Sequence, residues 1–386
     1  MTYLSAKEAA EKLNISLATL YAYVSRGMIH AVSAEDGSRQ KRYLRADVER
    51  LINRKEARRA PDAMMESALS WGMPMLESSI TLIDSGRLFY RGHDALQLAH
   101  EWDVEHVAGL LWGDDPARLF AAENFITLPD CPESPDYTRL QVILAFASQY
   151  DYAAYDLRPE SVRMTGARIL RLMVQMLTGS YQPSIAEALA QAWRVDAAHI
   201  FNATLILCAD HELNASSFAA RVVASAGATP YAAVSAGLAT LSGVHHGGMT
   251  GRVEAFLREV QRPEDAAPVI AERLRRGESI PGFGHRLYPA GDPRGAALLE
   301  MLRDYPAGDA AERELVQAVI EAAESITGEK PSIDFALVAM SRQLGVDKPL
   351  VIFALGRMLG WIAHTIEQIQ TGELIRPRAR YTGKLP

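Results

Sequence analysis

The pattern of apolar and polar residues separates a short first segment from a long, mostly helical remainder. From about Ala63 onward, apolar residues recur at three- and four-residue spacing, which is the period of an amphipathic helix. The pattern is clearest in the runs ARILRLMVQML (167–177), AEALAQAW (186–193), AAPVIAERLRR (266–276) and AERELVQAVIEAAESI (311–326). Extended patterns are short and few, and the clearest is SSITLIDSGRLFYRG (78–92), a hairpin turning at Ser85-Gly86. The sequence therefore predicts an all-α body.

The first residues predict two helices joined by a tight turn. Ser5-Ala6-Lys7-Glu8 is a capping-box pattern, so a helix is expected from there to about Leu13. Ser16 is placed to cap a second helix that runs through Val24.

A basic hairpin and a third helix are expected next. Asp36-Gly37 lies between two short extended runs, AVSAE and SRQKRYL, as in a hairpin. A further helix is expected from about Asp47 into Arg59. Helix, turn, helix and hairpin wing together are typical of a winged helix-turn-helix, which we assign to residues 1–57, with a linker at 58–64.

This first segment resembles the excisionase-like branch of the MerR-type helix-turn-helix domains. The resemblance rests on YLSAKEAAEKLNISLATLYAYVSRGMI followed by RYLRADVERLI. It implies that the residues facing a DNA groove are among Leu17, Ala18, Thr19, Tyr21 and Ala22, with Arg39, Lys41 and Arg42 contacting phosphates from the wing. The alternative is a three-helix unit that packs against the body or a partner, because a fold alone does not fix a function.

Composition and charge fit this division. Apolar residues make up 48% and charged residues 23%, as in ordinary globular proteins. The net charge of −7 is the sum of +5 over residues 1–60 and −12 over the rest, which suggests two modules with different partners. Only two cysteines occur, Cys131 and Cys208, and the N-terminus has no apolar signal core, so a cytoplasmic location is expected.

The uncharged stretch 222–251 is rich in small residues and is expected to form a buried helix or subunit contact, not a membrane span.

Histidines, arginines and one aspartate concentrate in the second half of the chain. No nucleophile elbow, zinc-protease helix, dinucleotide fingerprint or P-loop occurs, and the histidines lack the short spacing of metal ligands. Several arginines with neutral-capable histidines and one carboxylate suit a site that binds a small polyanion and moves a proton. The candidates are His211, His246, His285, Arg294, Asp334, Arg357 and Arg376.

The order of the segments that carry these residues resembles the citrate synthase family. The match covers about residues 65–386. It begins at ESSITLIDSGRLFYRGHDALQLA and continues through ADHELNASSFAARV, HHGG, PGFGHRLYPAGDPR, PSIDF, ALGRMLGWIAHTIEQ and RPRARYTG. The resemblance implies an acyltransferase that converts acyl to alkyl on transfer, condensing acetyl-CoA with oxaloacetate to give citrate and CoA.

The resemblance also implies the role of each residue. His246 polarises the thioester carbonyl, Asp334 removes the α-proton, and His285 hydrogen-bonds the oxaloacetate ketone. The oxaloacetate carboxylates are held by His211, Arg294 and Arg357, with Arg376 donated by the second subunit of a homodimer. His246 works best neutral, because a charged imidazole would form an ion pair with Asp334 and weaken the base. No metal or redox cofactor is required, since the CoA thioester enters as a substrate.

The implied fold is an all-helical subunit with a large domain at 65–247 and 346–386 and a small domain at 248–345. Closure of the small domain after oxaloacetate binds would bring base and electrophile together and protect the thioester from hydrolysis. Two alternatives stay open: a 2-methylcitrate synthase that uses propionyl-CoA, and a DNA-binding regulator whose body senses a metabolite.

Overall fold

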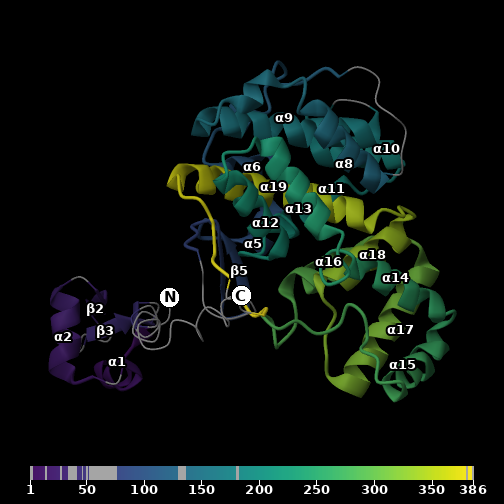
Figure 1. The fold of residues 1–386 in the computed structure, drawn as a ribbon. Helices are drawn as coiled ribbons and strands as arrows, with labels where there is room; N and C mark the ends of the chain where they lie inside the picture. The colour runs from purple at the N-terminus through teal and green to yellow at the C-terminus, as the bar shows by residue number, and fades with distance from the viewer. Residues whose placement is uncertain are drawn as a thin grey trace. The chain divides into compact units, whose positions relative to one another are not determined.

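The computed structural model describes residues 3–13, 15–26, 28–33, 41–45, 47–48, 51, 76–128, 136–179, 182–379 and 381–384. The chain forms two units, Met1–Glu77 and Ser78–Pro386 (Figure 1).

The first unit is a small helix-turn-helix with a sheet. Its elements are β1 (Tyr3–Leu4), α1 (Ala6–Leu13), α2 (Leu17–Ser25), β2 (Ala31–Ser33) and β3 (Lys41–Leu44). Both predicted caps are confirmed: Ser5 N–H donates to Glu8 at 2.8 Å, and Thr19 N–H donates to the Ser16 hydroxyl at 3.2 Å. Leu4, Leu13, Leu20 and Tyr43 belong to its buried core.

The sheet of the first unit contains a strand, β1, that the alternation pattern did not predict. β3 pairs antiparallel with both β2 and β1, giving the strand order β1-β3-β2. At two residues, β1 is too short to show a period of two, which explains why the pattern missed it. Asp36-Gly37, Arg39, most of the expected third helix and the 58–64 linker lie outside the described residues.

The second unit opens with the predicted hairpin. β4 (Thr81–Asp84) pairs antiparallel with β5 (Arg87–Tyr90), which also pairs with β6 (His93–Asp94). The turn residues Ser85 and Gly86 both have positive φ, at 52° and 76°, as a tight hairpin turn requires.

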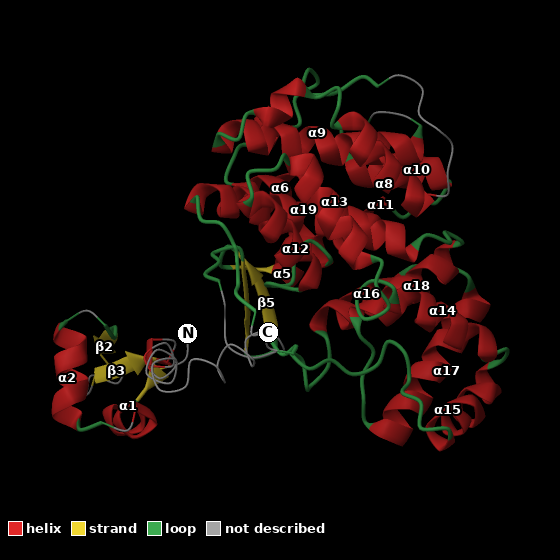
Figure 2. Cartoon of the chain, in the orientation of Figure 1, coloured by secondary structure: helices red, strands yellow, loops and turns green. Residues whose placement is uncertain are grey.

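The rest of this unit is helical (Figure 2). The helices are α5 (Ala95–Glu101), α6 (Val104–Trp112), α7 (Pro116–Leu119), α8 (Asp136–Ala147), α9 (Pro159–Thr178), α10 (Ile185–Trp193), α11 (Ala198–Leu207), α12 (Ala215–Ser225), α13 (Pro230–Leu241), α14 (Met249–Glu259), α15 (Ala266–Arg275), α16 (Pro293–Asp304), α17 (Ala310–Thr327), α18 (Ile333–Leu344) and α19 (Pro349–Thr371), with 3₁₀ turns at Tyr152–Tyr155 and Pro263–Asp265. The all-α expectation for the body is confirmed. The division into domains at 248 and 345 stays a prediction.

Helix α19 is the central helix of this unit. It packs against α6, α9, α11, α12 and α13 (Figure 1). Among the described helices it is the one long and apolar enough to cross a membrane, but 89% of its most apolar window is buried in the protein, as in a core helix. The uncharged stretch 222–251 includes α13, whose Gly237 lies under Trp361 of α19: a Cβ there would come within 2.5 Å of the indole ring.

Candidate active site

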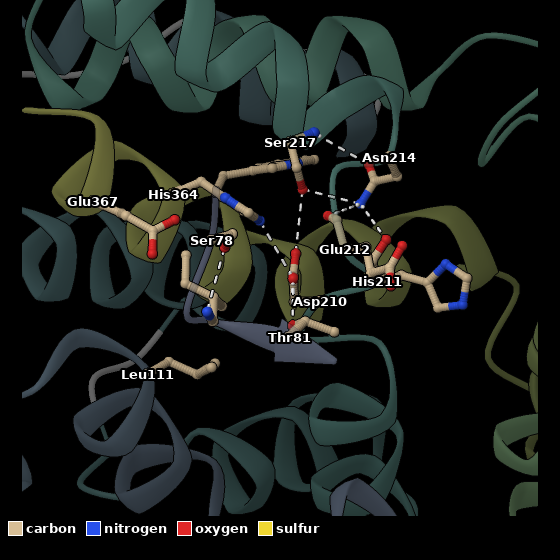
Figure 3. Close-up of polar contacts among 12 residues, drawn as sticks. Ser78, Thr81, Leu111, Asp210, His211, Glu212, Asn214, Ser217, His364 and Glu367 are labelled. Atoms are coloured by element: carbon tan, nitrogen blue, oxygen red, sulfur yellow. Dashed lines mark hydrogen bonds and ion pairs between the residues drawn. The ribbon is translucent and has the colours of Figure 1, made fainter. Parts of the chain in front are cut away.

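The connection from α11 to α12 carries His211 and lies directly on α19. Arg357 Nε donates to the Cys208 carbonyl at 2.7 Å, and Gly360 N–H donates to the Ala209 carbonyl at 3.0 Å. Gly360 permits this close approach, because a Cβ there would lie 2.4 Å from the same carbonyl oxygen. Figure 3 shows the connection, with the His211 ring pointing away from the polar contacts around Asp210.

His211 is buried among other site residues. Its Nε2 lies 3.1 Å from the Tyr288 hydroxyl, and its ring centroid lies 5.2 Å from that of His285. Burial lowers the pKa of His211 well below its usual value, and the charges of Arg294 and Arg357 lower it further. The imidazole is therefore neutral at physiological pH.

His246 lies in the turn between α13 and α14. Its Nε2 is 2.8 Å from the Ser216 hydroxyl, which also accepts a hydrogen bond from Trp361 Nε1 at 3.0 Å. Burial, followed by the nearby charge of Arg357, lowers the pKa of His246 to about 3. This histidine is also neutral at physiological pH.

The Ser216 hydroxyl can set the tautomer of His246. Its single proton can go to His246 Nε2 or to Asn214 Oδ1, which lies 2.7 Å away. Asn214 Oδ1 already accepts the backbone N–H groups of Ser216 and Ser217. Donation of the hydroxyl proton to His246 Nε2 leaves the ring proton on Nδ1, whereas donation to Asn214 Oδ1 places it on Nε2.

His285 lies in a loop that is tied to the segment before α18. Gly284 N–H donates to the Lys330 carbonyl at 2.9 Å, and Ser332 N–H donates to the Gly282 carbonyl at 2.8 Å. Leu287 N–H donates to His285 Nδ1 at 3.2 Å, so the neutral ring carries its proton on Nε2. Burial, then the charge of Arg294, lowers the pKa of His285. The ring thus presents an N–H donor.

Asp292 contacts both Arg294 and the backbone of Ile333, the residue before Asp334. Arg294 Nε and Nη2 donate to the two Asp292 oxygens at 3.0 and 2.8 Å, and Ile333 N–H donates to the same carboxylate at 3.1 Å. Burial favours the neutral carboxyl of Asp292, but Arg294 outweighs it and the pKa is lowered. Asp292 therefore joins the N-terminus of α16 to that of α18.

Asp334 lies in the first turn of α18, where it is partly buried. Burial raises its pKa to about 6, with the charge of Arg294 opposing that shift and the charge of Asp292 adding to it. A carboxyl group in that range is ionised at neutral pH and is a stronger base than an exposed aspartate.

Arg357 presents a buried donor without a partner. Its side chain is almost fully buried on α19, and its guanidinium lies 4.9 Å from the centre of the Phe353 ring. Among the described residues, Nη1 has no hydrogen-bond partner. Burial lowers the pKa of Arg357, while the charge of Asp210 opposes this. An unpaired buried guanidinium nitrogen is costly, and an anionic ligand would satisfy it.

Six of the seven residues predicted for the body's site lie close enough that their charges affect one another's pKa values. His211 is influenced by His246, His285, Arg294 and Arg357, and Asp334 by both arginines. No hydrogen bond joins His246 to Asp334 in the described structure, but the charge of Arg357 acts on both. Arg376 is exposed in the segment after α19, and no described residue forms a hydrogen bond or ion pair with it.

The structure adds supporting residues that the sequence argument left without a role. These are Ser216, Tyr288 and Asp292, which all lie within the quoted motifs, five, three and two positions from His211, His285 and Arg294 respectively. Within the described part of the chain, no group of three His, Cys, Asp or Glu residues is arranged to hold a metal ion.

The residues predicted to contact DNA are on the first unit. Tyr21 is 52% exposed on α2, Thr19 is half-buried on the same helix, and Lys41 and Arg42 are exposed on β3. The surface of this unit therefore combines an exposed helix face with basic side chains on the wing.

Comparison with known proteins connects both units to families. A model described as "Citrate synthase, C-terminal domain" matches residues 68–378, and one described as "Helix-turn-helix domain" matches residues 3–56. "Citrate synthase 2" of Bacillus subtilis is 42% identical over 188 residues, so this chain spans only half the length of that relative. "Citrate synthase" of Haloferax volcanii is 32% identical, with 81% of this chain and 94% of the relative covered.

A solved structure has the same fold. A ternary complex of carboxymethyl coenzyme A and oxaloacetate with citrate synthase from Thermoplasma acidophilum matches with a TM-score of 0.69 and 24% identity. The match covers 81% of this chain and 95% of that chain.

Proposed function

The chain belongs to the citrate synthase family, and on that premise we propose that its body condenses a short acyl-CoA with oxaloacetate. The observation that carries this proposal is the convergence of three neutral-favoured histidines, one basic carboxyl group and two buried arginines. The arginines suit the two carboxylates of oxaloacetate, and the unpartnered Arg357 Nη1 is a ready donor for one of them.

In the first step, Asp334 removes a proton from the α-carbon of the thioester. His246 donates its Nδ1–H to the thioester oxygen, where negative charge develops as that proton leaves. In this step the Ser216 hydroxyl donates to Nε2, 2.8 Å away, so that the ring carries its proton on Nδ1. Because the pKa of His246 is about 3, the ring is a neutral donor and does not form an ion pair with Asp334.

In the second step, the enol carbon attacks the ketone carbon of oxaloacetate. His285 donates from Nε2 to the ketone oxygen, which becomes the hydroxyl of the product as it gains the proton. Water then hydrolyses the new thioester, releasing CoA and a tricarboxylate, and this makes the condensation effectively irreversible. Every group in this sequence is a side chain of this chain or part of a substrate.

The acyl group distinguishes two versions of this function. Acetyl-CoA would give citrate, and propionyl-CoA would give 2-methylcitrate after only a small enlargement of the pocket. Thiol release measured with each thioester plus oxaloacetate tests both versions. We expect turnover that Asp334→Ala abolishes. Absence of turnover with either thioester would contradict the proposed enzyme.

We further propose that the working unit is a homodimer in which Arg376 serves the partner's site. Arg376 is exposed and no described residue forms a hydrogen bond or ion pair with it. Mixing inactive Asp334→Asn subunits with inactive Arg376→Ala subunits should restore activity, because one site in each hybrid dimer then has both residues intact. No recovery after subunit exchange would place Arg376 outside the site.

Residues 248–345 carry His285, Arg294 and Asp334, whereas His211, His246 and Arg357 come from the rest of the body. We propose that this segment closes over oxaloacetate before the thioester reacts. Structures with and without oxaloacetate should differ in its orientation, and identical orientations would contradict closure.

For the first unit we propose DNA binding, favoured by the helix-turn-helix match and the exposed Lys41 and Arg42. The chain would then be an enzyme that also acts as a regulator. Binding to duplex DNA should weaken steeply with salt, and Lys41→Ala/Arg42→Ala should reduce both affinity and salt dependence. Unchanged DNA mobility at low salt would leave this unit as a packing module.

A further inference from the structure

Three residues on one face of α19 hold three consecutive residues of the α11–α12 connection. Arg357 binds the Cys208 carbonyl, Gly360 binds the Ala209 carbonyl, and His364 Nε2 lies 3.3 Å from the Asp210 carboxylate. The spacing of three and then four residues places all three on the same helix face. Residue 211, a histidine of the proposed site, follows directly in the chain.

Asp210 is a buried carboxylate that takes no direct ion pair from an arginine or lysine in the described structure. It is fully buried, and its donors come from three separate elements: Thr81 of β4 at 2.6 Å, Ser217 of α12 at 3.2 Å and His364 of α19 (Figure 3). Tyr90 also donates to its backbone carbonyl at 3.2 Å. Such a set of contacts fixes both the side chain and the backbone of residue 210.

A buried histidine at position 364 lowers the stability of the core unless its contact with Asp210 offsets the loss. It is fully buried, and its Nδ1 has no hydrogen-bond partner among the described residues. A buried polar nitrogen without a partner is unfavourable, and an apolar side chain would fill this position without that cost. Packing alone therefore does not account for a histidine here.

Asp210 also acts on Arg357 across the connection. Its negative charge favours the charged guanidinium of Arg357, although the two side chains share no hydrogen bond in the described structure. Because Asp210 forms no direct ion pair with Arg357, the Nη1 of Arg357 stays unpartnered among the described residues. A direct ion pair would have occupied the donors that a ligand needs.

We propose that Asp210 and His364 are a buried pair of positioning residues for the oxaloacetate site. The pair holds the chain so that His211 projects into the site, next to the Cys208 carbonyl that Arg357 binds. Figure 3 shows the Asp210 side chain directed at Thr81 and His364, with the His211 ring on the other side. This inference rests on the proposed function, because it assigns the pair to the binding of oxaloacetate.

The test compares four variants of the full-length protein in oxaloacetate binding by calorimetry and in the KM for oxaloacetate. His364→Leu removes the donor to Asp210 at similar volume, and His364→Gln retains an N–H at about the Nε2 position. Thr81→Val removes a different donor to the same carboxylate. Thr365→Val is the matched control, because this buried neighbour donates only within the helix, to the Trp361 carbonyl.

We expect His364→Leu to weaken oxaloacetate binding about tenfold or more relative to Thr365→Val, as loss of a hydrogen bond to a charged group predicts. His364→Gln should recover most of the affinity, and Thr81→Val should weaken it in the same direction. Binding by His364→Leu as tight as in Thr365→Val would overturn the proposal. If His364→Leu does not fold, equal affinity of Thr81→Val and Thr365→Val overturns it instead. Failure of the wild-type protein to bind oxaloacetate would contradict the proposed function itself.

Discussion

Replacing the proposed base, Asp334, with asparagine should abolish activity and at the same time stabilise the protein. Burial raises the pKa of this carboxyl from 3.8 to about 6, so the folded protein pays a penalty whenever Asp334 is ionised. Asparagine keeps the shape of the side chain but cannot ionise. The penalty therefore disappears together with the base.

The size and the pH range of the effect follow from the pKa. A shift of roughly two units corresponds to about 3 kcal/mol of unfolding free energy. Below about pH 4 the carboxyl group is protonated in both the folded and the unfolded chain, so the variant gains nothing. As the pH rises from about 4 to about 6, the unfolded chain ionises first and the wild type loses stability. Above about pH 6 the full difference is expressed.

Thermal melting of the two proteins between pH 4.5 and 8.5 measures this difference. We expect the Tm of Asp334→Asn to exceed that of the wild type by about 5 °C at pH 8, with the difference shrinking toward pH 4.5. Asp347→Asn, a change at an exposed aspartate before α19, is the control and should shift Tm by less than about 1 °C. A difference that does not vary with pH, or a less stable variant at pH 8, would refute the argument that burial raises the proton affinity of Asp334.

Three further predictions follow from the same geometry. In steady-state assays, kcat should fall about tenfold per pH unit below about pH 6, because Asp334 must be ionised for catalysis. His246, with a pKa of about 3, stays neutral over this range. A fall in kcat that begins only at a lower pH would exclude Asp334 as the titrating base. Arg357→Met should weaken oxaloacetate binding about a hundredfold in calorimetry, because it removes the buried guanidinium whose unpartnered Nη1 is available to an anion. It should also lower Tm, because the Cys208 carbonyl loses its donor, and oxaloacetate binding as tight as in the wild type would contradict the proposed role. Gly360→Ala should lower the unfolding free energy by about 2 kcal/mol in denaturant titrations, because the new Cβ would lie 2.4 Å from the Ala209 carbonyl oxygen. An unchanged denaturation midpoint would contradict the close approach of α19 to the α11–α12 connection.

Local features of the fold could be predicted from the sequence because their causes are local. The Ser5–Glu8 capping box and the Ser16 cap satisfy backbone groups within four residues, so the residues themselves reveal the helix starts. The Ser85-Gly86 turn is similar, because its positive φ angles depend on the turn residues alone. The order of the polar motifs along the chain indicated which side chains would meet, although their spacing alone did not place them together.

The protonation of the site could not be predicted in the same way. The lowered pKa values of His211, His246 and His285 and the raised pKa of Asp334 have burial as their largest cause, and burial depends on helices far away in the sequence. The bidentate contact of Arg294 with Asp292 is close in sequence, but its link to Ile333 of α18 spans 41 residues.

Helix α19 shows why an apolar sequence pattern can conceal functional residues. Its burial and hydropathy are those of a core helix, yet its polar side chains hold segments of the proposed site: Arg357 binds the Cys208 carbonyl, Trp361 binds Ser216, and His364 binds Asp210. Buried polar groups favour a hydrogen-bond partner because water cannot reach them, and the partners of these three side chains lie in or next to the α11–α12 connection. Polar residues on a helix that is otherwise buried therefore mark the segment that the helix orients. In this chain that segment leads to one site histidine through Asp210 and to another through Ser216.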